Sequence, residues 1–95
     1  MVLSKHAERR CKSRSIPQRV IELIMTYGKQ EKSRHDLRFS MDRKGFEEML
    51  AYEDRGEIKR FEHKLRAYLI VAEGDVLVTA AYEHGHPRGL NALRR

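Results

Sequence analysis

Residues 68–82 decide the fold, and they read YLIVAEGDVLVTAAY. Two short apolar runs, residues 68–72 and 76–82, flank the glycine-centred turn 73–75. Apolar runs on either side of such a turn predict an antiparallel β-hairpin. Because both runs are almost continuously apolar, the pattern also predicts strands that are buried on both faces, in mid-sheet, with helices packed against them.

Residues 15–28, upstream of the hairpin, carry the clearest helix pattern. Ser15 and Gln18 have the spacing of a capping box, and Pro17 is tolerated in a first helical turn. Gly28 is placed to end the helix in a left-handed conformation. The apolar positions between them follow the helical period and are Ile16, Val20, Leu23, Ile24 and Tyr27.

The segments on either side of this helix are shorter. Leu3, Ala7 and Cys11 form a narrow apolar stripe, which predicts a first helix near residues 4–13. Residues 29–36 are polar throughout, and we expect them to form a loop.

The chain between residues 37 and 65 is expected to hold a strand and further helix. Residues 37–41 alternate apolar and polar side chains, which is typical of a half-buried strand. Asp42 can cap a third helix that ends before Gly56. Apolar residues at positions 58, 61 and 65 indicate one or two more helical turns.

These elements predict an α+β fold in which N-terminal helices pack on a small antiparallel sheet. The 95 residues fit a single domain spanning 1–95. The single cysteine cannot pair within the chain, and no apolar run approaches the roughly 20 residues that cross a bilayer. The first residues lack the apolar core of a signal peptide, so we expect a cytoplasmic protein without a membrane partner.

Positive charge is concentrated in the first part of the chain. The formal net charge is +6, and residues 1–40 hold ten Lys and Arg against four Asp and Glu. Residues 41–95 hold ten of each kind, so the whole excess lies before residue 41. A localised basic field attracts polyanions, of which nucleic acid is the commonest. The alternative is the solvated surface of an ordinary basic protein.

Two groups of side chains could carry out metal-independent RNA cleavage. His6, Arg10 and Arg14 recur every four residues and would share one helix face. Histidine suits proton transfer near neutral pH, and arginine suits a phosphate group. The second group, at the end of the last predicted strand, is Thr79, Tyr82 and His84.

Both groups also have simpler interpretations, namely an exposed basic helix and ordinary strand-end residues. Further cations could contact nucleic-acid phosphates, and they are Arg9, Lys12, Arg19, Lys44 and Arg88. His84 and His86 lack further ligands at a recognisable spacing, so we expect neither a metal nor another cofactor.

The segment from His6 through Arg10 and Arg14 to Pro17 resembles the opening helix of the domain-of-unknown-function family 4258. Residues 67–71, Gly74 and residues 78–79 resemble its closing hairpin. That family has been grouped with the barnase–EndoU–colicin–RelE fold of small toxin ribonucleases.

The resemblance implies a toxin-like endoribonuclease, often paired with an antitoxin. By motif it assigns functional roles to His6, Arg10, Arg14, Thr79 and His84. Relatives often have Gly–His–Arg after the last strand, whereas this chain has Glu83 and a displaced Arg88 there.

Three functions remain open from the sequence. The first is a metal-independent endoribonuclease. The second is a non-catalytic basic module that binds nucleic acid, which predicts affinity that falls steeply with salt. The third is a small phage or plasmid accessory protein that binds and inhibits an acidic host protein through the same cations.

Overall fold

The predicted hairpin forms the centre of the sheet. The computed structural model describes residues 2–82, in which β4 (Ala67–Ala72) and β5 (Val76–Tyr82) pair antiparallel. Gly74 has φ 83°, a left-handed conformation that glycine adopts without steric cost. The turn predicted from the sequence is therefore confirmed.

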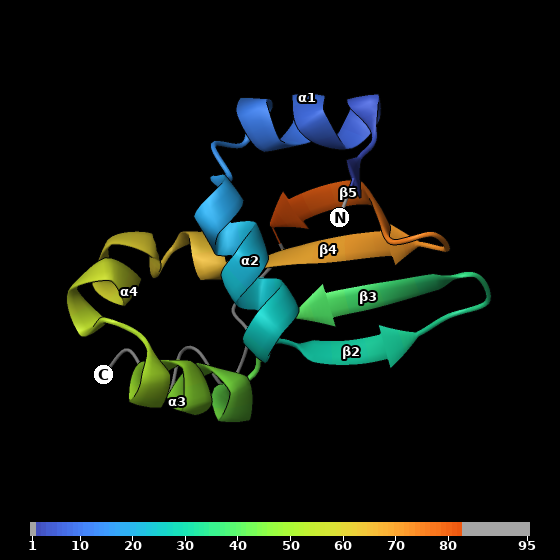
Figure 1. The fold of residues 1–95 in the computed structure, drawn as a ribbon. Helices are drawn as coiled ribbons and strands as arrows, with labels where there is room; N and C mark the ends of the chain where they lie inside the picture. Colours follow the sequence, from blue (N-terminus) through green and yellow to red (C-terminus); the bar gives the residue numbers. More distant parts are fainter. Residues whose placement is uncertain (1, 83–95) are drawn as a thin grey trace.

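Three more strands complete a sheet of order β1-β5-β4-β3-β2 (Figure 1). β3 (Asp36–Ser40) pairs antiparallel with β4, and β2 (Lys29–Lys32) pairs antiparallel with β3. β1 (Val2–Leu3) pairs parallel with β5, so the sheet is mixed. The expected α+β class is confirmed, although the sheet is larger than predicted.

The prediction of a loop over residues 29–36 was wrong at both ends, because residues 29–32 form the edge strand β2 and Asp36 begins β3. All four of its residues are exposed, which explains why no apolar pattern marks it. Its backbone pairing with β3 defines the strand. Charged residues on an edge strand also discourage pairing with other chains.

The helices cover one face of the sheet, so the prediction of strands buried on both faces was wrong. Along β4, Ala67, Leu69 and Val71 are buried, whereas the alternate residues are half-buried. This alternation is the signature of a sheet with one covered face. The apolar side chains Tyr68 and Ile70 therefore lie on the opposite face.

The first helix, α1 (Lys5–Ser13), packs along β5 (Figure 1). The Ser4 hydroxyl accepts a hydrogen bond from the Ala7 amide at 3.0 Å and caps the helix. Ala7 and Cys11 are buried, as the apolar stripe predicts.

The second helix, α2 (Gln18–Tyr27), begins later than predicted, and the capping box at Ser15 was wrong. Ser15 has φ 52°, and Pro17 is the N-cap residue. The backbone turns at Ser15 and the Ile16 side chain is buried in the core.

Gly28 does end the helix, but its φ of −71° and ψ of 159° are extended, so the predicted left-handed conformation was wrong. Glycine is required there for space, since a Cβ atom would overlap the Ile24 carbonyl oxygen.

Two further helices connect β3 to β4. The Asp42 side chain caps α3 (Arg43–Tyr52) by accepting from the Gly45 amide at 2.8 Å, as predicted. Asp54 caps α4 (Arg55–Phe61) in the same way, and a 3₁₀ turn over Lys64–Arg66 leads into β4. The helical turns expected after residue 56 are therefore present.

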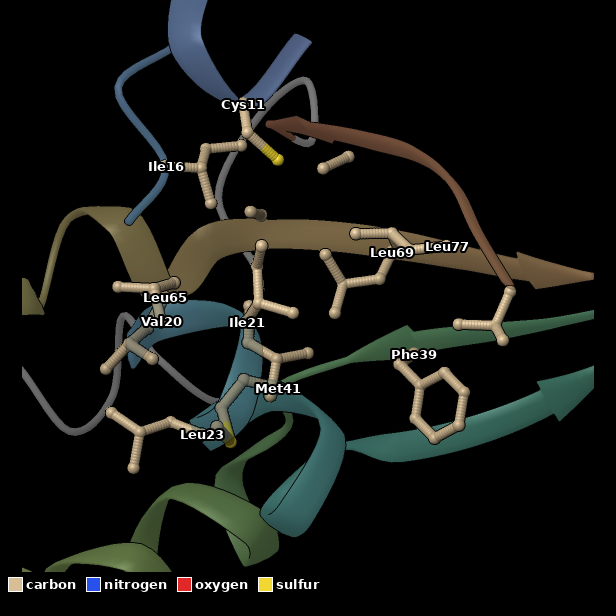
Figure 2. Close-up of a cluster of buried hydrophobic side chains, with 14 of the residues drawn as sticks. Cys11, Ile16, Val20, Ile21, Leu23, Phe39, Met41, Leu65, Leu69 and Leu77 are labelled. Atoms are coloured by element: carbon tan, nitrogen blue, oxygen red, sulfur yellow. The ribbon is translucent and has the colours of Figure 1, made fainter. Parts of the chain in front are cut away.

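One apolar core lies between the helices and the covered face of the sheet (Figure 2). Leu69 and Leu77 reach it from the hairpin, and Ile21 and Leu65 reach it from the helical side. Within residues 2–82, no helix has both the length and the apolar character needed to cross a membrane.

Candidate nucleic-acid interface

The outer surface of α1 is the most basic stretch of helix in the described chain. Ala7 and Cys11 face β5, so the other side chains of α1 point outward and are exposed. The cationic or titratable ones are Lys5, His6, Arg9, Arg10 and Lys12, which we call the α1 basic face. Glu8 is the single acidic residue in the helix.

The α1 basic face is not neutralised by neighbouring carboxylates. Within residues 2–82, none of its Lys and Arg residues forms an ion pair with an Asp or Glu. The contrast is clear at Arg38 and Arg43, which pair with Glu31 and Glu47. The positive charge of α1 is therefore available to an external anion.

His6 and Arg10 are neighbours on this face. The Arg10 Nε donates to the His6 Nε2 at 3.4 Å, a long contact between two exposed side chains. A ring nitrogen accepts a hydrogen bond only when it carries no proton. The contact therefore uses the same lone pair with which His6 Nε2 would act as a general base.

Arg14 follows the last turn of α1 and has a structural contact. Its Nη1 donates to the Ala80 carbonyl oxygen at 2.9 Å in a partly buried position. β1 pairs only with Val76 and Leu77, so Ala80 lies beyond β1 on the edge of β5. The guanidinium thus satisfies a carbonyl that no other strand within residues 2–82 pairs with.

Tyr82 meets the same segment from the end of β5. Its hydroxyl donates to the Arg14 carbonyl oxygen at 3.1 Å, and burial raises the pKa of Tyr82. Arg14 and Tyr82 were both predicted as catalytic, and the structure brings them together. Their hydrogen bonds are made to backbone oxygens.

Thr79 is close to this contact in the chain, but its side chain is on the other face of the sheet. It pairs with Ile70, whereas the buried Ala80 pairs with Leu69 on the helix-covered face. The structure therefore separates the Thr79 side chain from α1. His84 and Arg88 lie outside the described residues.

Arg19, predicted to contact nucleic acid, is held instead by carboxylates of the helical layer. Its Nη2 lies 2.7 Å from Glu53 Oε1 and 2.9 Å from Glu57 Oε1. Hydrogen bonds with these carboxylates, first Glu57 and then Glu53, raise the pKa of Arg19. Its charge is balanced within the fold, unlike that of the α1 basic face.

Tyr27 extends this ionic network. Its hydroxyl donates to Glu53 Oε2 at 2.6 Å, which raises the pKa of Tyr27. Hydrogen bonds from Tyr27 and then Arg19 lower the pKa of Glu53. The partners are 26 to 38 residues apart in sequence, so no local spacing could indicate them.

The other predicted phosphate contacts differ in position. Arg9 and Lys12 belong to the α1 basic face, whereas Lys44 is exposed on α3. The structure therefore groups Arg9 and Lys12 with His6 and Arg10, on a different helix from Lys44.

The surface formed by residues 2–82 includes two hollows. One, of about 280 Å³, is lined by Cys11, Lys12, Ser15, Ile16, Pro17 and Lys64. Burial raises the pKa of the Cys11 thiol, which disfavours the reactive thiolate. The other, of about 310 Å³, is lined by Lys32, Arg34, His35, Asp36, Leu37, Val71, Ala72 and Glu73.

Neither hollow is lined by His6, Arg14, Thr79 or Tyr82, so neither is a shared cleft for the predicted catalytic groups. The sequence interpretation missed the second hollow. Its residues come from two hairpins, and only the pairing of β3 with β4 brings them together.

In the part of the chain that the structure describes, no three His, Cys, Asp or Glu side chains gather closely enough to hold a metal ion. No family model, curated protein or solved structure matches this chain.

Proposed function

We propose that this protein binds RNA through the α1 basic face. The observation that carries the proposal is the set of exposed cations on one helix that lack carboxylate partners within residues 2–82. Binding such cations to phosphates releases counterions from the nucleic acid, which supplies most of the non-specific affinity.

The local charge balance favours α1 over the other helices. Residues 4–14 hold five Lys and Arg against one Glu, whereas residues 53–64 hold four against four, with Glu53 and Glu57 bound to Arg19. An incoming phosphate is therefore attracted to α1 without a competing row of carboxylates.

The test is a fluorescence-anisotropy titration of a short labelled single-stranded RNA at several salt concentrations. A variant with Arg9→Ala, Arg10→Ala and Lys12→Ala is expected to bind weakly. The matched control carries Arg55→Ala, Lys59→Ala and Arg60→Ala on α4, and it should bind like the wild type. If RNA affinity fell equally in both variants, net charge alone would explain the binding, and the assignment to α1 would be wrong.

The same titration separates RNA from an acidic protein as the ligand of α1. RNA binding requires an affinity that falls steeply as salt is raised. If the wild-type protein bound no RNA at low salt but captured one acidic protein through α1, the binding proposal would be wrong.

RNA cleavage is a second candidate, and one contact favours it. Arg14 links the end of α1 to the end of β5, close to Tyr82. A nuclease of this kind needs a base, an acid and a cation around one phosphate. His6 and Arg10 supply a base and a cation along α1, and the sequence places His84 two residues beyond the end of β5.

Cleavage is tested by incubating labelled RNA with the protein in EDTA. A metal-independent nuclease would give fragments with 2′,3′-cyclic phosphate ends, and the combined His6→Ala and His84→Ala variant would lose this activity. Intact RNA with wild-type protein, under conditions where binding is measured, would reject cleavage and retain the binding function.

A further inference from the structure

The second hollow lies at the end of the sheet where two hairpin turns project (Figure 1). Lys32 at the end of β2 and Arg34 and His35 in the following turn line one side, and the turn after β4 supplies Glu73. Its volume of about 310 Å³ is at the lower end of the range of small-ligand pockets.

The wall of this hollow includes an apolar part. Leu37 on β3 and Val71 on β4 are direct partners in the sheet, and Ala72 follows on β4. Val71 is buried and Leu37 is half-buried. An apolar surface of this kind suits a flat, weakly polar group such as a nucleobase.

The rim of the hollow carries charges of both signs. Lys32 and Arg34 are exposed on one hairpin, and Glu73 is exposed on the other. Within residues 2–82, none of these three side chains forms an ion pair. Two donors, Lys32 and Arg34, therefore line the same hollow as two carboxylates, those of Glu73 and the half-buried Asp36.

We propose that this hollow binds one nucleotide whose base carries an exocyclic amino group. The base would pack on Leu37 and Val71, and its amino group would donate to the Glu73 carboxylate. The phosphate would lie against Lys32 and Arg34. Carboxylates accept from the cytosine amino group, and Arg and Lys bind phosphate oxygens. Uracil, which has a carbonyl in place of that amino group, is disfavoured.

This inference rests on the proposed RNA binding, to which it adds a second contact. The Val2 amide donates to the Asp75 carbonyl oxygen at 3.2 Å, and the Ser4 amide donates to the Leu77 carbonyl oxygen at 2.9 Å. β1 therefore lies beside the turn that carries Glu73, and α1 starts beside Leu77 on β5. One RNA strand would contact both the α1 basic face and the hollow.

The test is an NMR titration of the full chain with cytidine monophosphate, uridine monophosphate and inorganic phosphate. Cytidine monophosphate is expected to give saturable shifts confined to residues 32–37 and 71–73. Uridine monophosphate should bind about tenfold more weakly, because it cannot make one charge-assisted hydrogen bond. Equal binding of the two nucleotides, or of phosphate alone, would overturn the site.

Substitutions at two exposed residues test which side chains contact the nucleotide. Glu73→Ala should remove the preference for cytidine over uridine monophosphate, and Arg34→Ala should weaken both nucleotides. Glu48→Ala on α3 and Lys59→Ala on α4 are the matched controls and should change neither affinity. Retained cytidine preference in Glu73→Ala would show that the assignment of the carboxylate is wrong.

The outcome is separable from that of the proposed function. Absence of the nucleotide shifts with retained α1-dependent RNA binding would overturn this site alone. Nucleotide shifts in a protein that binds no RNA would overturn the proposed function and establish the hollow as a site for free nucleotides.

Discussion

Arg14 forms two hydrogen bonds with the end of β5, as donor to Ala80 and as acceptor from Tyr82. Arg14 donates to the Ala80 carbonyl oxygen at 2.9 Å, and Tyr82 donates to the Arg14 carbonyl oxygen at 3.1 Å. The pair ties the end of α1 to the end of β5, across 66 and 68 residues of sequence. Both residues are therefore expected to contribute to stability, whatever else they do.

Tyr82→Phe tests one half of this clamp. The substitution keeps the ring and removes one partly buried hydrogen bond, so the free energy of unfolding should fall by about 1 kcal/mol. Urea unfolding followed by circular dichroism measures the change. Tyr52→Phe, at an exposed position, is the control and should be neutral.

Arg14→Ala tests the other half. It leaves the Ala80 carbonyl oxygen without its charged donor, and we expect the free energy of unfolding to fall by about 1–3 kcal/mol. Arg14→Lys should recover part of this stability, since a lysine can still donate. A variant as stable as the wild type would show that the hydrogen bond adds nothing to the folded state.

The ionic network of Glu53 predicts a pH dependence. Tyr27 and Arg19 lower the pKa of Glu53 from 4.5, so its carboxylate is favoured in the folded state. Its contribution is complete above about pH 4.5, the unfolded value, and disappears as pH falls through the lowered value. Melting temperatures measured from neutral to acidic pH should therefore fall less steeply in Glu53→Gln.

Tyr27 gives the opposite sign at alkaline pH. Its pKa is raised from 10.0, first by the hydrogen bond to Glu53, so its neutral form is favoured in the folded state. This contribution is present below pH 10.0 and disappears as pH rises through the raised value. A Tyr27→Phe variant should lack it, which alkaline melting curves would show.

Gly45 is predicted to be the least replaceable glycine of the helices. A Cβ atom there would overlap the Tyr27 carbonyl oxygen, so Gly45→Ala must push α3 away from α2. Overpacking of this kind costs about 1–3 kcal/mol. Gly56→Ala, in the exposed first turn of α4, is the control and should cost less, because its Cβ would meet only the Asp54 side chain, at 3.2 Å.

The salt dependence of RNA binding reports how many phosphates the α1 basic face neutralises. Each cation removed from this face should lower the slope of log affinity against log salt by about 0.7. Single Ala substitutions at Arg9 and Lys12, titrated at three salt concentrations, measure this directly. Lys44→Ala, on α3, should leave the slope unchanged if α1 alone binds the strand.

Elements with local signals were predictable from the sequence. The turn at Gly74 and the cap at Asp42 depend on residues within a few positions of each other, and both are confirmed. β1 and β2 were missed because one is two residues long and the other is entirely polar. Their pairing is set by distant strands, which no local pattern reports.

The same distinction applies to the site. The exposed face of α1 follows from helical spacing, so His6 and Arg10 were correctly placed together. Arg14 bonds to a residue 66 positions away, and Arg19 bonds to a carboxylate 38 positions away. Composition alone cannot show that these two charges stabilise the fold. In this protein, therefore, only some of the cations near the start of the chain are available to bind a ligand.

The pairing of β1 with β5 constrains the order in which the molecule assembles. Val2 aligns with Val76, and α1 packs on β5, so the first helix has no docking surface until the last described strand has formed. Contacts between such distant segments slow folding because a long loop must close first. A nascent chain that ends before residue 76 would carry its basic helix unanchored, and only completion of the hairpin would fix the orientation of those cations.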